Sequence, residues 1–171
     1  MAKPAQRLKR PPHLEALAGL SRAKVDYLLI GVLAINHYAK DPGSIYSTLD
    51  CDVLLRPDPS HVSRALRVLG GLGYSFKSGR EPLLPDPLTV SRLVQNRAMI
   101  RAEKEGSLPL DLVLEARGFS FEDFYRRRRM FKAAGVGIPV GNLAQLLRSK
   151  ELSGRPKDRA FLRLYRSRLS T

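Results

Sequence analysis

Residues 48–55 read Thr48-Leu49-Asp50-Cys51-Asp52-Val53-Leu54-Leu55. The aliphatic residues predict a strand over 47–55 whose polar side chains alternate at positions 48, 50 and 52. Residues two apart in a strand project to the same side, so Asp50 and Asp52 place two carboxylates on one face, about 7 Å apart along the backbone. Two such carboxylates repel each other, and a divalent cation between them offsets the repulsion. Mg²⁺ suits this position because it prefers oxygen ligands. The pattern indicates a metal site, although an Asp-x-Asp by itself is common.

A third carboxylate lies in another apolar segment, residues 109–114, which predicts a strand containing Asp111. An isolated Asp in such a strand costs a few kcal/mol unless it is paired or bound to a metal. If the two strands are neighbours, Asp50, Asp52 and Asp111 form a three-carboxylate cluster able to hold two metal ions. Cys51 alternates away from the carboxylates, and we expect it to be a small buried hydrophobe.

The segments around these two strands predict a mixed α/β (α+β) fold. A strand over 25–30 ends at Gly31 and leads into a helix over 32–39. The whole chain, 1–171, is expected to be one domain, with a basic segment or helix over 1–23 and C-terminal helices over 141–171 beside the active site. Further helices are expected over 60–71, opened by Ser60, and over 119–129, 142–152 and 156–169; further strands over 73–76, 97–103 and 132–139; and a loop or lid over 78–89.

The net charge of +14 is concentrated at the two ends of the chain. Residues 126–171 contain thirteen basic and two acidic side chains, whereas residues 25–125 contain eleven and thirteen. A localised basic excess indicates an anionic partner such as a nucleic acid, although solvated Arg-rich helices would give the same pattern. The run Arg126–Arg129 is expected to wrap around a helix, so it cannot all face one phosphate track.

The composition also excludes several classes of protein. A hydrophobic fraction of 43% is enough for a core, which argues against disorder. The longest apolar stretch, 25–35, carries Asp26 and is too short to span a bilayer, and the basic start of the chain lacks a secretory signal. We therefore expect no membrane contact and a cytoplasmic location, with which the single cysteine is compatible.

These features together resemble the small bacterial nucleotidyltransferases of the DNA-polymerase-β-like superfamily, and most closely their minimal and abortive-infection type IV toxin-like members. The resemblance covers about residues 24–168. Its most specific parts are the Asp50/Asp52 strand with Thr48 upstream, and the run from Lys150 to Arg155-Pro-Lys157-Asp158. It implies a mixed sheet flanked by helices, and transfer of a nucleoside monophosphate from an NTP to an acceptor hydroxyl with Mg²⁺ or Mn²⁺.

The resemblance also implies roles for particular residues. Asp50 and Asp52 would bind the catalytic metals, and Asp111 would bind one metal and activate the acceptor hydroxyl. The nucleotide and its phosphates would be bound by Gly31, Val32, Thr48, Lys150, Arg155 and Lys157. RNA, such as the 3′ end of a tRNA, is the expected acceptor, and an antitoxin protein is an expected partner.

Two positions depart from the family pattern. The glycine turn reads Gly31-Val32 where relatives have Gly-Gly or Gly-Ser, and Tyr46 stands where relatives often have Arg. Both changes weaken the expected triphosphate site, so a catalytically degenerate fold that binds nucleic acid or a protein is the alternative. An ordinary DNA-binding module is disfavoured, because the sequence contains no helix-turn-helix or zinc pattern.

Overall fold

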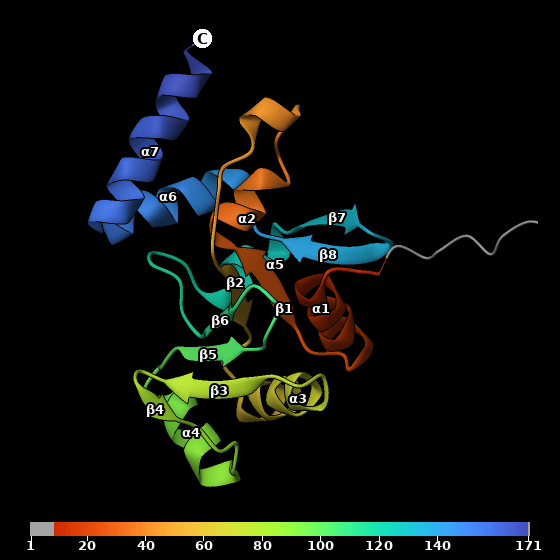
Figure 1. Ribbon diagram of the computed structural model, residues 1–171. Helices are drawn as coiled ribbons and strands as arrows, with labels where there is room; N and C mark the ends of the chain where they lie inside the picture. Colours follow the sequence, from red (N-terminus) through yellow and green to blue (C-terminus); the bar gives the residue numbers. More distant parts are fainter. Residues whose placement is uncertain (1–8, 171) are drawn as a thin grey trace, which may run out of the picture.

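The computed structural model describes residues 9–170, which form an eight-stranded mixed sheet with helices packed around it (Figure 1). The strands, in their order across the sheet, are β4 (Glu81–Pro82), β3 (Ser75–Ser78), β5 (Ile100–Glu103), β6 (Leu110–Val113), β2 (Cys51–Leu55), β1 (Tyr27–Ile30), β8 (Val136–Val140) and β7 (Arg129–Ala133). The pairs β2/β6 and β1/β8 are parallel, and the other neighbours are antiparallel. The mixed α/β class predicted from the sequence is confirmed.

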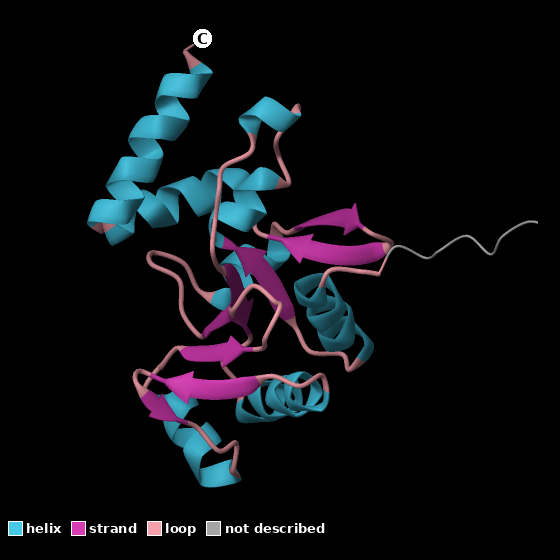
Figure 2. Ribbon diagram, in the orientation of Figure 1, coloured by secondary structure: helices cyan, strands magenta, loops and turns pink. Residues whose placement is uncertain are grey.

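Two pairs of helices lie at opposite ends of the molecule. Figure 2 shows α6 and α7 together at one end of the molecule and α3 and α4 together at the other. The described part of the chain contains α1 (Pro12–Arg22), α2 (Gly31–Asn36), α3 (Pro59–Gly71), α4 (Pro87–Gln95), α5 (Phe121–Arg126), α6 (Leu143–Ser153), α7 (Pro156–Leu169) and a 3₁₀ turn at Pro42–Ser44. None of these helices has both the length and the apolarity needed to cross a bilayer.

The core includes the neighbouring inner strands β1 and β2. Leu28, Leu29 and Leu54 are completely buried, because these strands have neighbours on both sides and helices packed against them. Helix α1 contacts α3 and β8, and its Leu17 and Leu20 are also completely buried. Cys51 is buried as expected, and burial raises the pKa of its thiol. Asp52 on β2 and Asp111 on β6 are therefore carried on strands that have neighbours on both sides.

Several helix ends follow the sequence signals. Ser120 and Asp123 form a complete capping box at the start of α5. Asn142 caps α6, whose last turn is closed by Gly154 at a φ of +61°. The cap of α3 differs from the prediction: Asp58, rather than Ser60, accepts hydrogen bonds from the backbone of the first turn, because Pro59 occupies the first helical position.

Four other predictions were wrong in detail. Strand β2 begins at Cys51, so Asp50 lies just before the strand instead of within it. The expected strand over 132–139 is a hairpin, β7–β8, and the expected loop over 78–89 contains β4 and the start of α4. Because α5 ends at Arg126 and β7 begins at Arg129, the four arginines span a turn and do not wrap around one helix. Of the basic N-terminal segment, residues 1–8 lie outside the described part.

Candidate active site

The register of the sheet aligns five residues from neighbouring strands in one row. Across β3, β5, β6, β2 and β1 the row reads Lys77, Arg101, Asp111, Asp52 and Ile30, each residue being opposite the next. Neighbouring strands lie about 4.8 Å apart, so residues in such a row are in contact range of each other. Across the sheet, two cationic residues, Lys77 and Arg101, therefore lie next to two carboxylates, Asp111 and Asp52, on adjacent strands.

Asp50 is placed beside this row by a short turn. The Thr48 hydroxyl donates to the Asp50 carbonyl oxygen at 3.1 Å, and the Asp50 backbone N–H points back to that hydroxyl at 3.4 Å. This local hydrogen bonding orients the residue that enters β2. Asp50 therefore reaches the same group of charges as Asp52 and Asp111, even though it precedes the strand.

Arg101 lies between two of the three carboxylates. Its Nη1 donates to both oxygens of Asp111, at 2.9 and 3.2 Å, and its Nη2 donates to Asp50 Oδ1 at 3.3 Å. Its Nε donates to Glu103 Oε1 at 3.3 Å. The guanidinium thus supplies the counter-charge that an Asp in an apolar strand needs, through pairing instead of a metal.

Gly31 brings the backbone up against the third carboxylate. It has a φ of +74°, and a Cβ on this residue would overlap Asp52 Oδ2. Only glycine combines that backbone conformation with so close an approach. The predicted turn between the first strand and its helix therefore sets the space in which the Asp52 side chain lies.

A cavity of about 870 Å³ opens between this face of the sheet and helices α6 and α7. Its lining includes all nine residues singled out from the sequence: Gly31, Val32, Thr48, Asp50, Asp52, Asp111, Lys150, Arg155 and Lys157. These residues come from segments more than a hundred positions apart in the chain. The structure therefore brings the predicted site residues together in one place.

The cations of this cavity are arranged by a buried carboxylate at the α6–α7 corner. Asp158 is almost completely buried and accepts from Lys150 Nζ at 3.0 Å, from Ser153 Oγ at 2.7 Å and from Arg155 Nε at 2.7 Å. Lys150 and Arg155 are therefore held in place. Lys157, on the first turn of α7, makes no ion pair with another residue in the described range.

Burial and mutual repulsion alter the carboxylates' affinity for protons. Burial, followed by the nearby charges of Asp111 and Asp50, raises the pKa of Asp52 to about 6, although Lys150 and Lys157 oppose the shift. Burial also raises the pKa of Asp111, and Arg101 partly offsets that effect. Negative charge at this point of the sheet is therefore costly, and a bound cation would relieve the cost.

The three carboxylates do not form the ready-made metal cluster expected from the sequence. Within residues 9–170 no group of three or more His, Cys, Asp or Glu side chains is arranged to hold a metal ion. Asp50 and Asp111 are instead directed onto Arg101. The donor set still fits a hard divalent cation, because it consists of carboxylate oxygens on neighbouring strands, where burial and then mutual repulsion raise the pKa of Asp52 and Asp111.

Sequence reasoning missed Arg101. The signal was present in the alternation of β5, where Ile100 and Ala102 are buried while Arg101 and Glu103 face the other side. It could not be used without knowing that β5 lies beside β6. The register that places Arg101 opposite Asp111 is a property of the sheet and not of either strand alone.

The two positions that depart from the family pattern have different surroundings. Val32 lines the cavity next to Gly31. Tyr46 is buried, packs edge-on against Phe161 at 4.9 Å and has the Arg168 guanidinium 4.4 Å above its ring. Tyr46 therefore packs the loop before β2 against helix α7.

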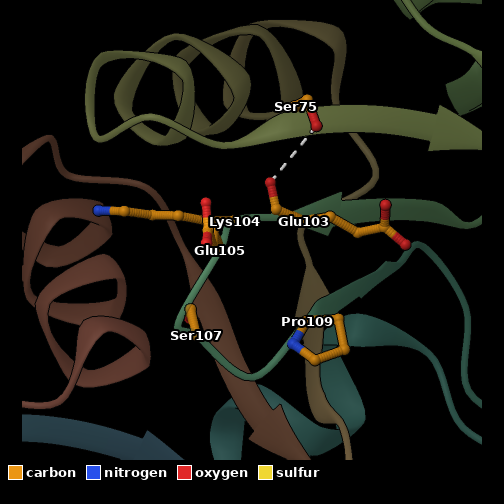
Figure 3. Close-up of a pocket in the computed structure, with 6 residues that line it drawn as sticks. All are labelled: Ser75, Glu103, Lys104, Glu105, Ser107 and Pro109. Carbon is orange, nitrogen blue, oxygen red and sulfur yellow. Dashed lines mark hydrogen bonds between the residues drawn. The ribbon is translucent and has the colours of Figure 1, made fainter.

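A second hollow, of about 390 Å³, lies at the far end of β5 (Figure 3). It is lined by Ser75, Glu103, Lys104, Glu105, Ser107 and Pro109. The Ser75 hydroxyl donates to the Glu103 carbonyl oxygen at 3.4 Å, and Figure 3 shows the Glu103 side chain pointing away from that of Lys104. The hollow is open and shallow, and none of the nine predicted site residues lines it.

Comparison with known proteins rests on structure. No protein-family model and no curated protein sequence matches the chain. A crystal structure from Thermotoga maritima, described as a "putative nucleotidyltransferase", superposes with a TM-score of 0.55 at 15% identity, covering 93% of this chain and 95% of that one. The fold of this chain is nucleotidyltransferase-like.

A second solved structure supports the same conclusion. An antigenic nucleotidyltransferase-like protein from Paracoccidioides brasiliensis superposes with a TM-score of 0.50 at 16% identity, over 91% of this chain and 73% of that one. At such low identity the likeness shows the nucleotidyltransferase-like fold alone. Function has to be argued from the residues of the cavity.

Proposed function

We propose that this protein is a metal-dependent nucleotidyltransferase that transfers a nucleoside monophosphate from an NTP to an acceptor hydroxyl. The observation that carries the proposal is the cavity itself, whose lining takes Asp50, Asp52 and Asp111 from the sheet side and Lys150 and Lys157 from the C-terminal helices. Carboxylates on one wall and cations on the other match a magnesium–triphosphate complex.

The residues have separate tasks in this reaction. Asp50, Asp52 and Asp111 are the ligands for Mg²⁺ or Mn²⁺, which when bound supplies charge stabilisation at the α-phosphate and at the attacking oxygen. Lys150, Arg155 and Lys157 neutralise the charge that collects on pyrophosphate as the bond between the α- and β-phosphates breaks. Gly31, Val32 and Thr48 line the cavity near Asp50 and Asp52, where they would contact the bound nucleotide and its phosphates.

Asp111 is suited to accept the proton of the acceptor hydroxyl. Burial raises the pKa of Asp111 above its usual range, which makes this carboxylate a better base than an exposed one. The acceptor oxygen then forms the new bond to the α-phosphorus, pyrophosphate leaves with the electron pair of the broken bond, and the proton passes from Asp111 to solvent. Arg101 has to release Asp111 for this step.

RNA is the acceptor that the charge distribution supports. Arg159, Arg163 and Arg166 are exposed on α7 at the i, i+4 and i+7 spacing that places side chains along one side of a helix. Lys157 and Phe161 of the same helix line the cavity, on the other side of the helix from these arginines, so a phosphate backbone bound along them would have to pass around α7 to reach the site. A tRNA 3′ end, a cytoplasmic toxin-like role and an antitoxin partner are carried by the family resemblance alone.

A catalytically inactive nucleotidyltransferase-like fold is the second candidate function. The specific observation in its favour is that Arg101 already neutralises Asp50 and Asp111. The Gly31-Val32 pair adds to it, because a β-branched residue limits close approach of a phosphate. Such a protein would bind nucleic acid or a partner without using the carboxylates.

Equilibrium binding of a labelled NTP, with Mn²⁺ and with EDTA, distinguishes the two candidates. The enzyme should bind the nucleotide only with the metal, and Lys157→Ala should weaken binding by about tenfold, because it removes a cation from the phosphate side. Lys132→Ala, which removes an exposed cation from β7, is the matched control and should leave binding unchanged. Metal-independent binding, or no binding, would favour the inactive fold.

A further inference from the structure

Arg101 is tied to three carboxylates at once. Its three guanidinium nitrogens reach Asp111, Asp50 and Glu103 over distances of 2.9 to 3.3 Å. Asp111 is nearly buried, and the Arg101 side chain itself is only about one third exposed, at 35%. Charge-assisted hydrogen bonds in such a partly desolvated position are stronger than pairs on the open surface.

These bonds occupy the oxygens that a metal would need. Nη1 is shared between both oxygens of Asp111, and Nη2 lies on Asp50 Oδ1. A magnesium ion approaches its carboxylate ligands to about 2.1 Å. At that position it would face the guanidinium across a single oxygen atom, where two cations repel strongly.

Asp52 offers a point of entry. Within residues 9–170 its carboxylate makes no ion pair. Its neighbour across the strand pair is another carboxylate, Asp111. Lys150 and Lys157 act on its charge only at longer range. An incoming cation can therefore contact Asp52 before it competes for the oxygens of Asp50 and Asp111.

Arg101 also has a place to withdraw to. Its Nε already donates to Glu103 on the same strand, and Glu103 is held in turn by Lys77 Nζ at 2.8 Å. The Glu103 carboxylate is about 39% exposed, so a guanidinium that moved onto it would be hydrated. The sheet register keeps Arg101 opposite Asp111 in either position.

We propose that Arg101 is a built-in counter-cation that occupies the carboxylate site of the free protein and must be displaced toward Glu103 before a divalent cation can bind. The inference rests on the proposed function, because it takes Asp50, Asp52 and Asp111 as the metal ligands. It makes the arginine a competitor of the metal. Removing Arg101 should therefore tighten metal binding, whereas removal of a residue that merely supports the carboxylates would weaken it.

The test measures Mn²⁺ binding in the absence of nucleotide and acceptor. The electron paramagnetic resonance signal of the free ion reports how much Mn²⁺ remains unbound. Arg101→Gln should bind Mn²⁺ about tenfold more tightly than the wild type, because it loses the competing charge. Arg92→Gln is the matched control: it removes one exposed positive charge from α4 and should bind as the wild type does. Mn²⁺ should also raise the melting temperature of Arg101→Gln more than that of the wild type.

Arg101→Lys keeps the charge but cannot span both carboxylates, and its affinity should lie between those of the wild type and Arg101→Gln. It carries the test if circular dichroism shows that Arg101→Gln does not fold. Equal or weaker Mn²⁺ binding by the Arg101 variants, beside clear binding by the wild type, would overturn the role of Arg101 alone. Failure of every protein to bind Mn²⁺ would overturn it together with the proposed metal site.

Discussion

At Gly31 the backbone turns with a φ of +74° and passes directly beside the Asp52 carboxylate. Two separate costs would follow from a side chain at this position. One is the strain of a left-handed conformation, about 1 kcal/mol for a residue other than glycine. The other is displacement of Asp52, whose oxygen a Cβ would overlap.

Gly31→Ala should therefore lower the free energy of unfolding by about 2–4 kcal/mol and disturb the carboxylate site. Gly106→Ala separates the two costs, because Gly106 has the same φ of +74° but nothing within 4 Å of the added Cβ. It should lose only about 1 kcal/mol. Urea unfolding of both variants makes the comparison, and equal losses would show that contact with Asp52 does not matter.

At the scale of helices, the α6–α7 corner depends on one buried carboxylate. Asp158→Asn would remove the negative charge that Lys150 and Arg155 share, and leave the nearly buried Lys150 without a counter-ion. We expect a loss of about 2–4 kcal/mol in the free energy of unfolding. Glu151→Gln removes the exposed ion pairs of the same two helices, with Arg148 and Arg166, and should change stability little. A small effect of Asp158→Asn in urea unfolding would contradict the account.

The same carboxylate predicts a dependence on pH. Burial acts to raise the pKa of Asp158, but hydrogen bonds from Ser153, Arg155 and Lys150 outweigh it and hold the pKa below the usual range. A group whose pKa is lower in the folded protein stabilises it above its unfolded pKa, about 4, and loses that contribution as the pH falls through the folded value. The stability difference between wild type and Asp158→Asn should thus be constant near neutral pH and shrink below about pH 4.

Elements with strong local signals were predicted well from the sequence. The capping box of Ser120 and Asp123 and the stop at Gly154 act within a few residues, so they are visible without the fold. The β7–β8 hairpin was missed because its turn contains Ala134 at a φ of +49°, a backbone conformation that alanine rarely adopts. Arg10 Nε donates to the Ala134 carbonyl oxygen at 3.3 Å, a contact from a distant part of the chain that a local pattern cannot show.

At the scale of the whole molecule, the sequence singled out residues that line one cavity but did not predict their balance of charge. Asp50, Asp52 and Asp111 were singled out because carboxylates in apolar strands need a partner, and the structure places all three in one cavity. That Arg101 is the partner follows from the pairing of β5 with β6, two strands whose order in the sheet no local signal encodes. The register of these two strands places Arg101 opposite Asp111.

The charge distribution predicts how RNA binding should respond to salt. Each phosphate neutralised on a single strand contributes about −0.7 to the slope of log affinity against log salt, so Arg159→Ala/Arg163→Ala should reduce the slope by about 1.4. The control Arg67→Ala/Arg92→Ala removes two exposed cations from α3 and α4, at the opposite end of the molecule from α7 (Figure 1), and should leave the slope unchanged. Equal effects of the two double variants in filter-binding titrations would rule out α7 as the RNA surface.

Transfer of label from each of the four α-³²P-labelled NTPs to total RNA, with Mg²⁺ or Mn²⁺, tests the central claim most directly. Wild-type protein should label the RNA, and Asp52→Asn should lose at least about 100-fold of the rate, because it removes a carboxylate that the metal needs. Asp41→Asn, at an exposed loop carboxylate that accepts a hydrogen bond from Ser44, should label RNA as the wild type does. Absence of metal-dependent transfer by the wild type to RNA, protein or small-molecule acceptors, or equal transfer by Asp52→Asn, would contradict the assignment of this site to nucleotidyl transfer.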